Sequence, residues 1–112
     1  MTAPEPVDLN ALEGEGPLWG LASTDLNATL LSWPAGHLVA EHVNAALDVL
    51  IVVIDGSGVV TVDGRRHAVS GGQALLVEKG ASRLIEAGAG GLRYLSVHRR
   101  RQPLQIEPLG DR

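Results

Sequence analysis

GHLVAEHVNAALDVLIVVIDGSGVVTVDG, residues 36–64, carries the clearest indication of fold in this 112-residue chain. Its apolar runs are short, rich in Val, Ile and Leu, and separated by glycine-containing turns. The tetrapeptide Val62-Asp63-Gly64-Arg65 predicts a tight hairpin, because Asp-Gly accepts the positive φ angles of a type I′ turn. Residues 49–54 are uniformly apolar and mostly β-branched, which predicts a strand covered on both faces.

The same alternation of short apolar runs and turn residues extends over most of the chain. It predicts strands at residues 18–22, 26–33, 38–43, 49–54, 58–62, 66–69, 73–77, 83–87 and 92–99. Gly56-Ser57-Gly58 is expected to form a hairpin and residues 88–91 a loop. Only residues 7–12 are compatible with a helical turn. Many short strands at even spacing predict a single all-β domain, either a sandwich or a barrel.

The composition restricts the class of protein. The chain is 45% hydrophobic and has no cysteine, so an aliphatic core can form but disulfides and thiolate metal sites cannot. Residues 1–16 are acidic and rich in Pro and Gly. We expect them to be a flexible arm, or one exchanged with a neighbouring chain, before a barrel domain at residues 17–112. The sequence shows neither a signal peptide nor a bilayer-spanning run, so we expect a cytoplasmic protein without membrane contact.

Charge is distributed unevenly along the chain. Residues 1–64 hold nine acidic residues and no Lys or Arg, whereas residues 65–112 hold nine basic and four acidic residues. The arginines at 99–101 lack interleaved aromatic residues and the chain is acidic overall, so we expect no nucleic-acid partner. The opposite charges can pair within the domain or across a homodimer. We expect a homodimer, because a barrel of this size has open sheet edges that proteins cover.

The spacing of Gly36, His42 and Gly56 resembles the first sequence motif of the cupins, a family of small barrels. That motif reads G-x5-H-x-H, then three or four residues, then E-x6-G. In this chain Asn44 stands at the second histidine and Val49 at the glutamate. The resemblance covers residues 26 to 98, roughly, and implies a single-domain cupin jelly-roll barrel, also called a double-stranded β-helix.

The second cupin motif, G-x5-P-x-G-x2-H-x3-N, is matched only at its glycines, Gly72 and Gly80. Glu78 replaces the proline, Arg83 the histidine and Ala87 the asparagine. The glycine spacing, the predicted hairpin and the number of strands agree with one another, as a foldable sequence requires.

The resemblance also implies where a metal would bind. Typical cupins hold a divalent metal with three His and one Glu, and the residues at those positions here are His42, Asn44, Val49 and Arg83. An amide is a weak ligand, valine is none, and a guanidinium repels a cation. We therefore expect no metal cofactor. The alternative is a divalent metal held by His42 with another histidine nearby, such as His37 or His98.

The candidate ligand-binding residues are His42, Asn44, Arg83, Tyr94 and His98. The first two are two residues apart, so on a strand they share a face, which the resemblance makes the barrel interior. They can bind a ligand or merely satisfy each other. Tyr94, Ser96 and His98 also share a strand face, which lines the mouth of a pocket or meets solvent or a partner chain.

Arg83 carries the strongest functional prediction. A buried arginine needs an anionic partner or several acceptors. Glu41, Asp48 or Glu86 could provide this inside the protein; otherwise the partner is a ligand. The planar guanidinium binds a carboxylate or a phosphate through two parallel hydrogen bonds.

Three functions are compatible with these features. The first is a metal-free barrel that binds a small anionic molecule in a cationic pocket. The second is a metal-dependent cupin enzyme, a dioxygenase or isomerase, with a rearranged ligand set. The third is a non-catalytic scaffold that forms a homodimer. Fold alone does not decide among them.

Overall fold

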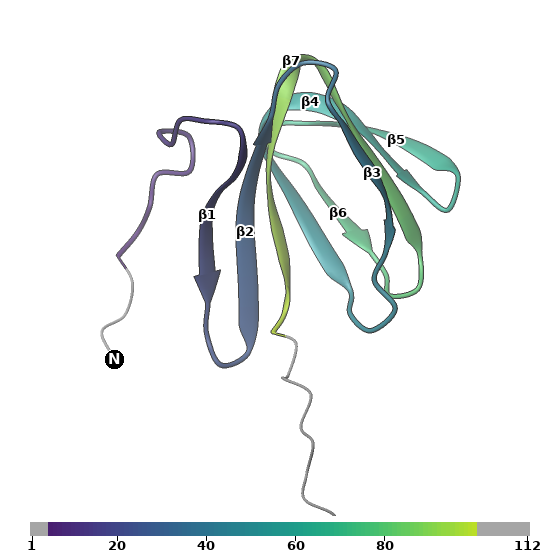
Figure 1. Ribbon diagram of the computed structural model, residues 1–112, viewed down its shortest axis with the longest axis horizontal. Coiled ribbons are helices and arrows are strands. Elements are labelled where there is room, and N and C mark those ends of the chain that lie inside the picture. The colour runs from purple at the N-terminus through teal and green to yellow at the C-terminus, as the bar shows by residue number, and fades with distance from the viewer. Residues whose placement is uncertain (1–4, 101–112) are drawn as a thin grey trace, which may run out of the picture.

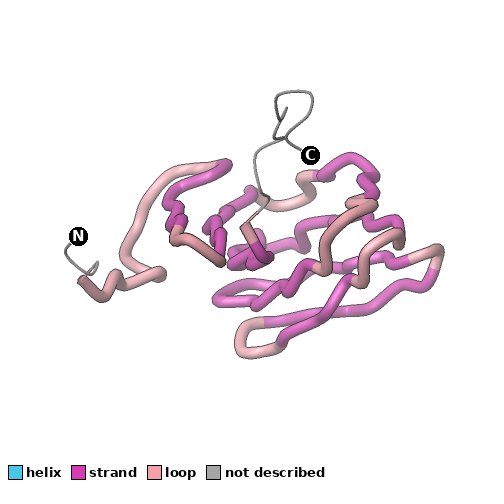
Figure 2. The backbone as a smooth tube through the Cα atoms, turned by 90° about the horizontal axis from the view of Figure 1, so that it is seen from below, coloured by secondary structure: helices cyan, strands magenta, loops and turns pink. Residues whose placement is uncertain are grey.

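The computed structural model describes residues 5–100, and these residues form strands, turns and loops without a helix (Figures 1 and 2). The expected all-β domain is confirmed. The strands are β1 (Gly16–Ala22), β2 (Leu26–Trp33), β3 (Leu38–Val43), β4 (Val49–Val62), β5 (Arg65–Ser70), β6 (Ala74–Val77) and β7 (Ser82–Arg99). Within the described part there is accordingly no helix of the length and apolarity needed to cross a membrane.

Two long strands, β4 and β7, pair with each other and organise the barrel. Their ends at residues 49–56 and 92–99 join β1, β2 and β6, and we call this half-sheet A. Their ends at residues 58–62 and 82–87 join β3 and β5, and we call this half-sheet B. All pairings are antiparallel. In Figure 1, β1 and β5 lie at opposite sides of the molecule.

The strands β4 and β7 were each expected to be two strands separated by a glycine turn, and this expectation is wrong. Gly56-Ser57-Gly58 lies inside β4 and residues 88–91 lie inside β7. Gly56 has a φ of 81° and Gly91 a φ of 83°, and the register between the two strands shifts on both sides of Gly56. Glycines at positive φ let the paired strands bend together without ending. The bend carries both strands from half-sheet A to half-sheet B.

Two smaller expectations have different outcomes. The hairpin between β4 and β5 is confirmed, with Asp63 at φ 47° and Gly64 at φ 82°, both in the left-handed region that a type I′ turn needs. The helical turn at residues 7–12 is wrong. A single turn lies there instead, closed by the Ala11 amide donating to the Asp8 carbonyl (3.1 Å). Short side chain–backbone bonds such as Asn10 N–H to Asp8 Oδ1 (3.0 Å) compete with helix in this position.

The described part of the acidic arm, residues 5–15, precedes β1, and a hydrogen bond from β7 connects it to the sheet. Nη1 of Arg93, on β7, donates to the Leu9 carbonyl (2.9 Å). Figure 1 shows the arm beyond β1, at the outer side of half-sheet A. Whether the arm exchanges between chains stays a prediction.

The inner faces of the two half-sheets form one aliphatic core. Its buried residues are Val49, Ile51, Val53, Val60, Val69, Val77, Ile85, Ala87, Leu92 and Tyr94. Alternation along the strands produces this set, since every second residue faces inward. The outer face of residues 49–54 is covered less than expected, because Leu50 remains 39% exposed in the single chain.

Candidate ligand site

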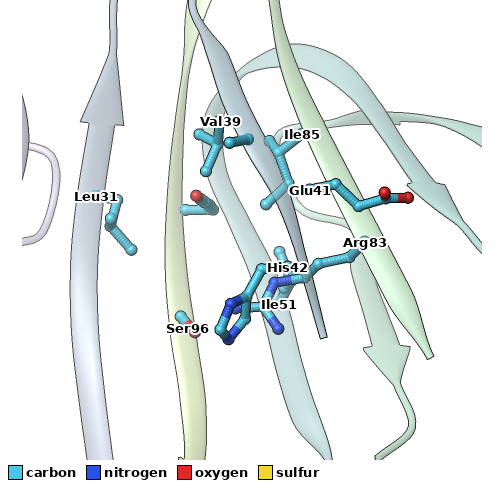
Figure 3. Close-up of a pocket in the computed structure, with 10 residues that line it drawn as sticks. Leu31, Val39, Glu41, His42, Ile51, Arg83, Ile85 and Ser96 are labelled. Atoms are coloured by element: carbon cyan, nitrogen blue, oxygen red, sulfur yellow. The ribbon is translucent and has the colours of Figure 1, made fainter. Parts of the chain in front are cut away.

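A cavity of about 410 Å³ lies between the inner faces of β2, β3, β4 and β7 (Figure 3). Half of its ten lining residues are aliphatic: Leu31, Val39, Ala40, Ile51 and Ile85. Its polar residues are Glu41, His42, Arg83, Tyr94 and Ser96. Ile51, Ile85 and Tyr94 are buried, whereas His42 is exposed, so the histidine stands at the mouth and the aliphatic groups at the floor.

A bulge in β3 brings His42 into the cavity. Val39 is paired with Ile85 and His42 with Arg83. From one pair to the next β3 advances by three residues and β7 by two, so β3 contains one extra residue. In a regular strand, residues 39 and 42 would point to opposite faces. The extra residue of the bulge restores both to the inner face. Figure 3 shows the imidazole of His42 and the guanidinium of Arg83 in the same space.

Arg83 has no anionic partner among residues 5–100. Its Nη1 atom is buried and makes no hydrogen bond there. Burial lowers the pKa of Arg83 below the usual arginine value, and the nearby Tyr94 hydroxyl partly offsets this effect. Arg83 as a whole is half-buried, but a buried guanidinium nitrogen without a hydrogen-bond acceptor is unfavourable.

The three acids that could neutralise Arg83 within the protein are engaged elsewhere. Glu41 Oε2 accepts a hydrogen bond from Ser82 Oγ (3.1 Å), and Figure 3 shows its carboxylate directed away from the guanidinium. Glu86 pairs with Arg66 (3.1 Å).

The third acid, Asp48, accepts the Lys79 backbone N–H (2.8 Å). No internal salt bridge therefore accounts for Arg83 in the described part of the chain.

Tyr94 connects the cavity to an aromatic cluster. Its hydroxyl accepts a hydrogen bond from Trp33 Nε1 (3.1 Å), and the Trp33 ring stacks on His37 with centroids 4.2 Å apart. Burial raises the pKa of Tyr94, while the Trp33 hydrogen bond and the Arg83 charge lower it by smaller amounts. Since the oxygen accepts from Trp33, the phenol proton is available for donation to another group.

Two candidate residues lie outside the cavity lining. Asn44 follows the end of β3, and its Oδ1 accepts the backbone N–H groups of Ala46 (3.1 Å) and Leu47 (3.0 Å). It thus closes the turn into β4 and does not share a strand face with His42. His98 Nδ1 lies 2.7 Å from the Arg99 carbonyl, near the end of β7. The structure brings together His42, Arg83 and Tyr94, together with Ser96.

Sequence reasoning missed the aliphatic lining, namely Leu31, Val39, Ile51 and Ile85. The sequence does not distinguish these residues from core residues. A strand with one buried face has aliphatic side chains on that face whether they line a cavity or pack in the core.

The residues at the cupin metal positions do not fit a divalent metal. Asn44 uses its oxygen to close a turn, Val49 is a core residue with 2% exposure, and Arg83 directs a cation into the cavity. Within residues 5–100, no group of three or more His, Cys, Asp or Glu side chains is placed to hold a metal ion. The absence of a metal cofactor stays a prediction.

The sole tyrosine of the chain gives a direct measurement of this site. We expect the phenolate absorbance of the folded protein to appear at higher pH than that of the protein in urea, whose tyrosine ionises near pH ~10. In Arg83→Met the transition should move higher still, because the cation that favours phenolate is gone. The folded state binds the phenol proton more tightly than the unfolded chain. The free energy of unfolding should therefore fall as pH rises above about 10, the pKa of tyrosine in the unfolded chain.

Circular dichroism at each pH must show that the chain is folded. Identical titrations of the folded and urea-unfolded protein would contradict the buried position of Tyr94, and identical titrations of parent and Arg83→Met would contradict its proximity to Arg83.

Two antiparallel half-sheets that share two long strands around an aliphatic cavity define a cupin barrel. The chain belongs to the family described as the AraC-like ligand-binding domain, which matches residues 30–102. Its fold is thus that of a cupin-type ligand-binding barrel. No curated protein matches the chain.

Solved structures agree on the fold. A cupin protein from Bacteroides fragilis has 19% identity and a TM-score of 0.74, over 99% of this chain and 96% of that one. The TT1209 protein from Thermus thermophilus has 21% identity and a TM-score of 0.75, over 88% and 100%. KdgF from Halomonas sp. has 19% identity and a TM-score of 0.71, over 78% and 81%. At these identities the similarity establishes the fold alone.

Proposed function

We propose that this protein binds a small anionic molecule in the cavity, through charge-assisted hydrogen bonds from Arg83. One observation carries the proposal: a guanidinium nitrogen is buried at an aliphatic cavity and has no partner among residues 5–100. Buried polar groups in proteins are nearly always hydrogen-bonded, so an exception points to a group that arrives from outside. Membership in a ligand-binding domain family supports an occupant of this kind.

The other two functions have less support. A metal-dependent dioxygenase or isomerase needs ligands that Asn44, Val49 and Arg83 do not supply. A scaffold without a ligand leaves the buried Arg83 nitrogen unexplained. A catalytic step would need a reacting group beside the bound anion, and no described contact identifies one.

The test compares anion binding by the parent and by Arg83→Met, using acetate and inorganic phosphate as probes. We expect at least one of the two anions to raise the melting temperature of the parent, because a ligand of the folded state stabilises it. Arg83→Met should bind that anion at least about tenfold more weakly, since one charge-assisted hydrogen bond contributes about 1.5 kcal/mol or more.

Arg65→Met is the matched control, because Arg65 is an exposed arginine on β5, outside the cavity lining. It should leave binding unchanged. If neither anion binds the parent, or if Arg83→Met binds as the parent does, the proposal is wrong. If Arg83→Met unfolds the chain, the arginine is a structural residue and the proposal is also wrong.

A homodimer stays our prediction. Among the strands of residues 5–100, β1 and β6 are the edges of half-sheet A, and β3 and β5 are the edges of half-sheet B. Unpaired edges favour association with another copy. Light scattering at micromolar concentration should give twice the chain mass of 11.7 kDa; a monomer would refute the prediction.

A further inference from the structure

The geometry points to a narrower ligand class, an aliphatic monocarboxylate, and this inference rests on the proposed anion binding. The ligand's carboxylate would pair with Arg83, and its hydrocarbon part would lie against the aliphatic wall of the cavity. Three features of the cavity carry the inference: its charge, its hydrogen-bond donors and its wall.

The charge of the cavity matches a single negative charge. Among the described lining residues, Arg83 is the one arginine or lysine. Glu41 also lines the cavity, but its carboxylate is bound to Ser82 and directed away from the guanidinium. A monoanion is neutralised by one guanidinium, whereas a dianion such as phosphate keeps an uncompensated charge in a partly buried place.

The hydrogen-bond donors match the two oxygens of a carboxylate. A guanidinium presents parallel N–H groups that fit a carboxylate bidentately. Tyr94 adds a hydroxyl whose proton is available, because its oxygen already accepts from Trp33 (3.1 Å). Ser96, two residues further along β7, adds a second hydroxyl on the same face.

The aliphatic wall of the cavity disfavours a ligand that carries polar groups along its length. Leu31, Val39, Ile51 and Ile85 offer no hydrogen-bond partner through their side chains. Hydroxyl groups held against them would lose water without compensation, which disfavours sugar acids. The volume of about 410 Å³ accepts a body on the order of a dozen non-hydrogen atoms. A short aliphatic chain has no hydroxyl groups to desolvate and fits within this volume.

The test measures affinity by calorimetry at mildly alkaline pH for acetate, butyrate and hexanoate, with hexanamide, gluconate and inorganic phosphate as comparisons. We expect affinity to rise by about threefold to fourfold for each methylene that enters the cavity. Hexanamide, gluconate and phosphate should each bind at least tenfold more weakly than hexanoate. Arg83→Met should lose hexanoate binding.

A second pair of variants tests where the hydrocarbon part lies. Val39→Thr keeps the side-chain shape and adds a hydroxyl to the cavity wall, so it should weaken hexanoate binding several-fold and by a larger factor than acetate binding. Val43→Thr is the control, because Val43 is on the same strand, is 49% exposed and does not line the cavity.

The outcomes separate this inference from the proposed function. If phosphate or gluconate binds more tightly than hexanoate and Arg83→Met loses that binding, anion binding stands and the aliphatic class is wrong. The same holds if affinity does not change with chain length, or if Val39→Thr and Val43→Thr have equal effects. If no anion binds, or if hexanamide equals hexanoate, both proposals fail.

Discussion

Gly56→Ala is expected to destabilise the barrel by about 3 kcal/mol or more, and the site should be lost with it. Gly56 has a φ of 81°, and a Cβ at this position would overlap the Gly91 carbonyl oxygen of the paired strand. A left-handed conformation costs a non-glycine residue about 1–2 kcal/mol. Forcing apart two packed strands adds about 1–3 kcal/mol. Urea denaturation followed by circular dichroism measures the change in the free energy of unfolding.

Gly64→Ala is the matched control for this prediction. Gly64 has nearly the same φ, 82°, but a Cβ there would have no atom within 4 Å. Its replacement should therefore cost only the conformational strain, about 1 kcal/mol. Equal costs at the two positions would contradict the close approach of β4 and β7 at Gly56.

The consequence for function follows from the position of the bend. On one side of it, β7 supplies Arg83 and Ile85 to the cavity; on the other side it supplies Tyr94 and Ser96. A straight strand could not place both pairs around one space, because the bend is what brings half-sheet B over half-sheet A. The glycines are thus a requirement of the site as well as of the fold.

The second large effect is expected for Leu30→Ala, at about 3 kcal/mol of lost stability. Leu30 is fully buried but is absent from the core cluster around the cavity. It is paired with Trp19 on one side and Leu95 on the other, so these three residues share the outer face of half-sheet A. Chemical denaturation gives the cost directly.

Leu38→Ala is the comparison for Leu30→Ala, because Leu38 is 56% exposed on β3. It should cost well under 1 kcal/mol, since surface replacements away from special features have small effects. A cost for Leu30→Ala no larger than that for Leu38→Ala would contradict the burial of the Leu30 side chain. The anion affinity of the Leu30→Ala variant should be unchanged, since Leu30 faces away from the cavity.

The proposed ligand site has a stability cost that these core positions do not have. Arg83 occupies an inward position in the row that continues with Ile85 and Ala87, where an aliphatic residue would pack without a charge to neutralise. Residues that hold a binding site often reduce the stability of the ligand-free protein. The unpaired guanidinium is therefore easier to explain as part of a site than as part of the core.

Local sequence patterns were enough to predict the class of fold and several elements in detail. The bounds of β2 and β3 agree with the expected strands 26–33 and 38–43, and the hairpin at Asp63-Gly64 agrees with the expected turn. These features depend on local chemistry, namely alternating burial and the φ angles that Asp and Gly accept. The inward position of Arg83 was also predicted, although through the cupin resemblance.

Which residues meet at the site depends on contacts between strands that lie far apart in the sequence. A glycine at positive φ can end a strand or bend it, and the choice at Gly56 depends on the paired bend at Gly91, 35 residues away in the printed sequence. The bulge that turns His42 inward exists only in the pairing of β3 with β7. Strand register also determines which groups the nearby acids contact. Glu41, for example, accepts a hydrogen bond from Ser82 and forms no ion pair with Arg83. Register is a property of two strands together, which is why no single stretch of the chain specifies it.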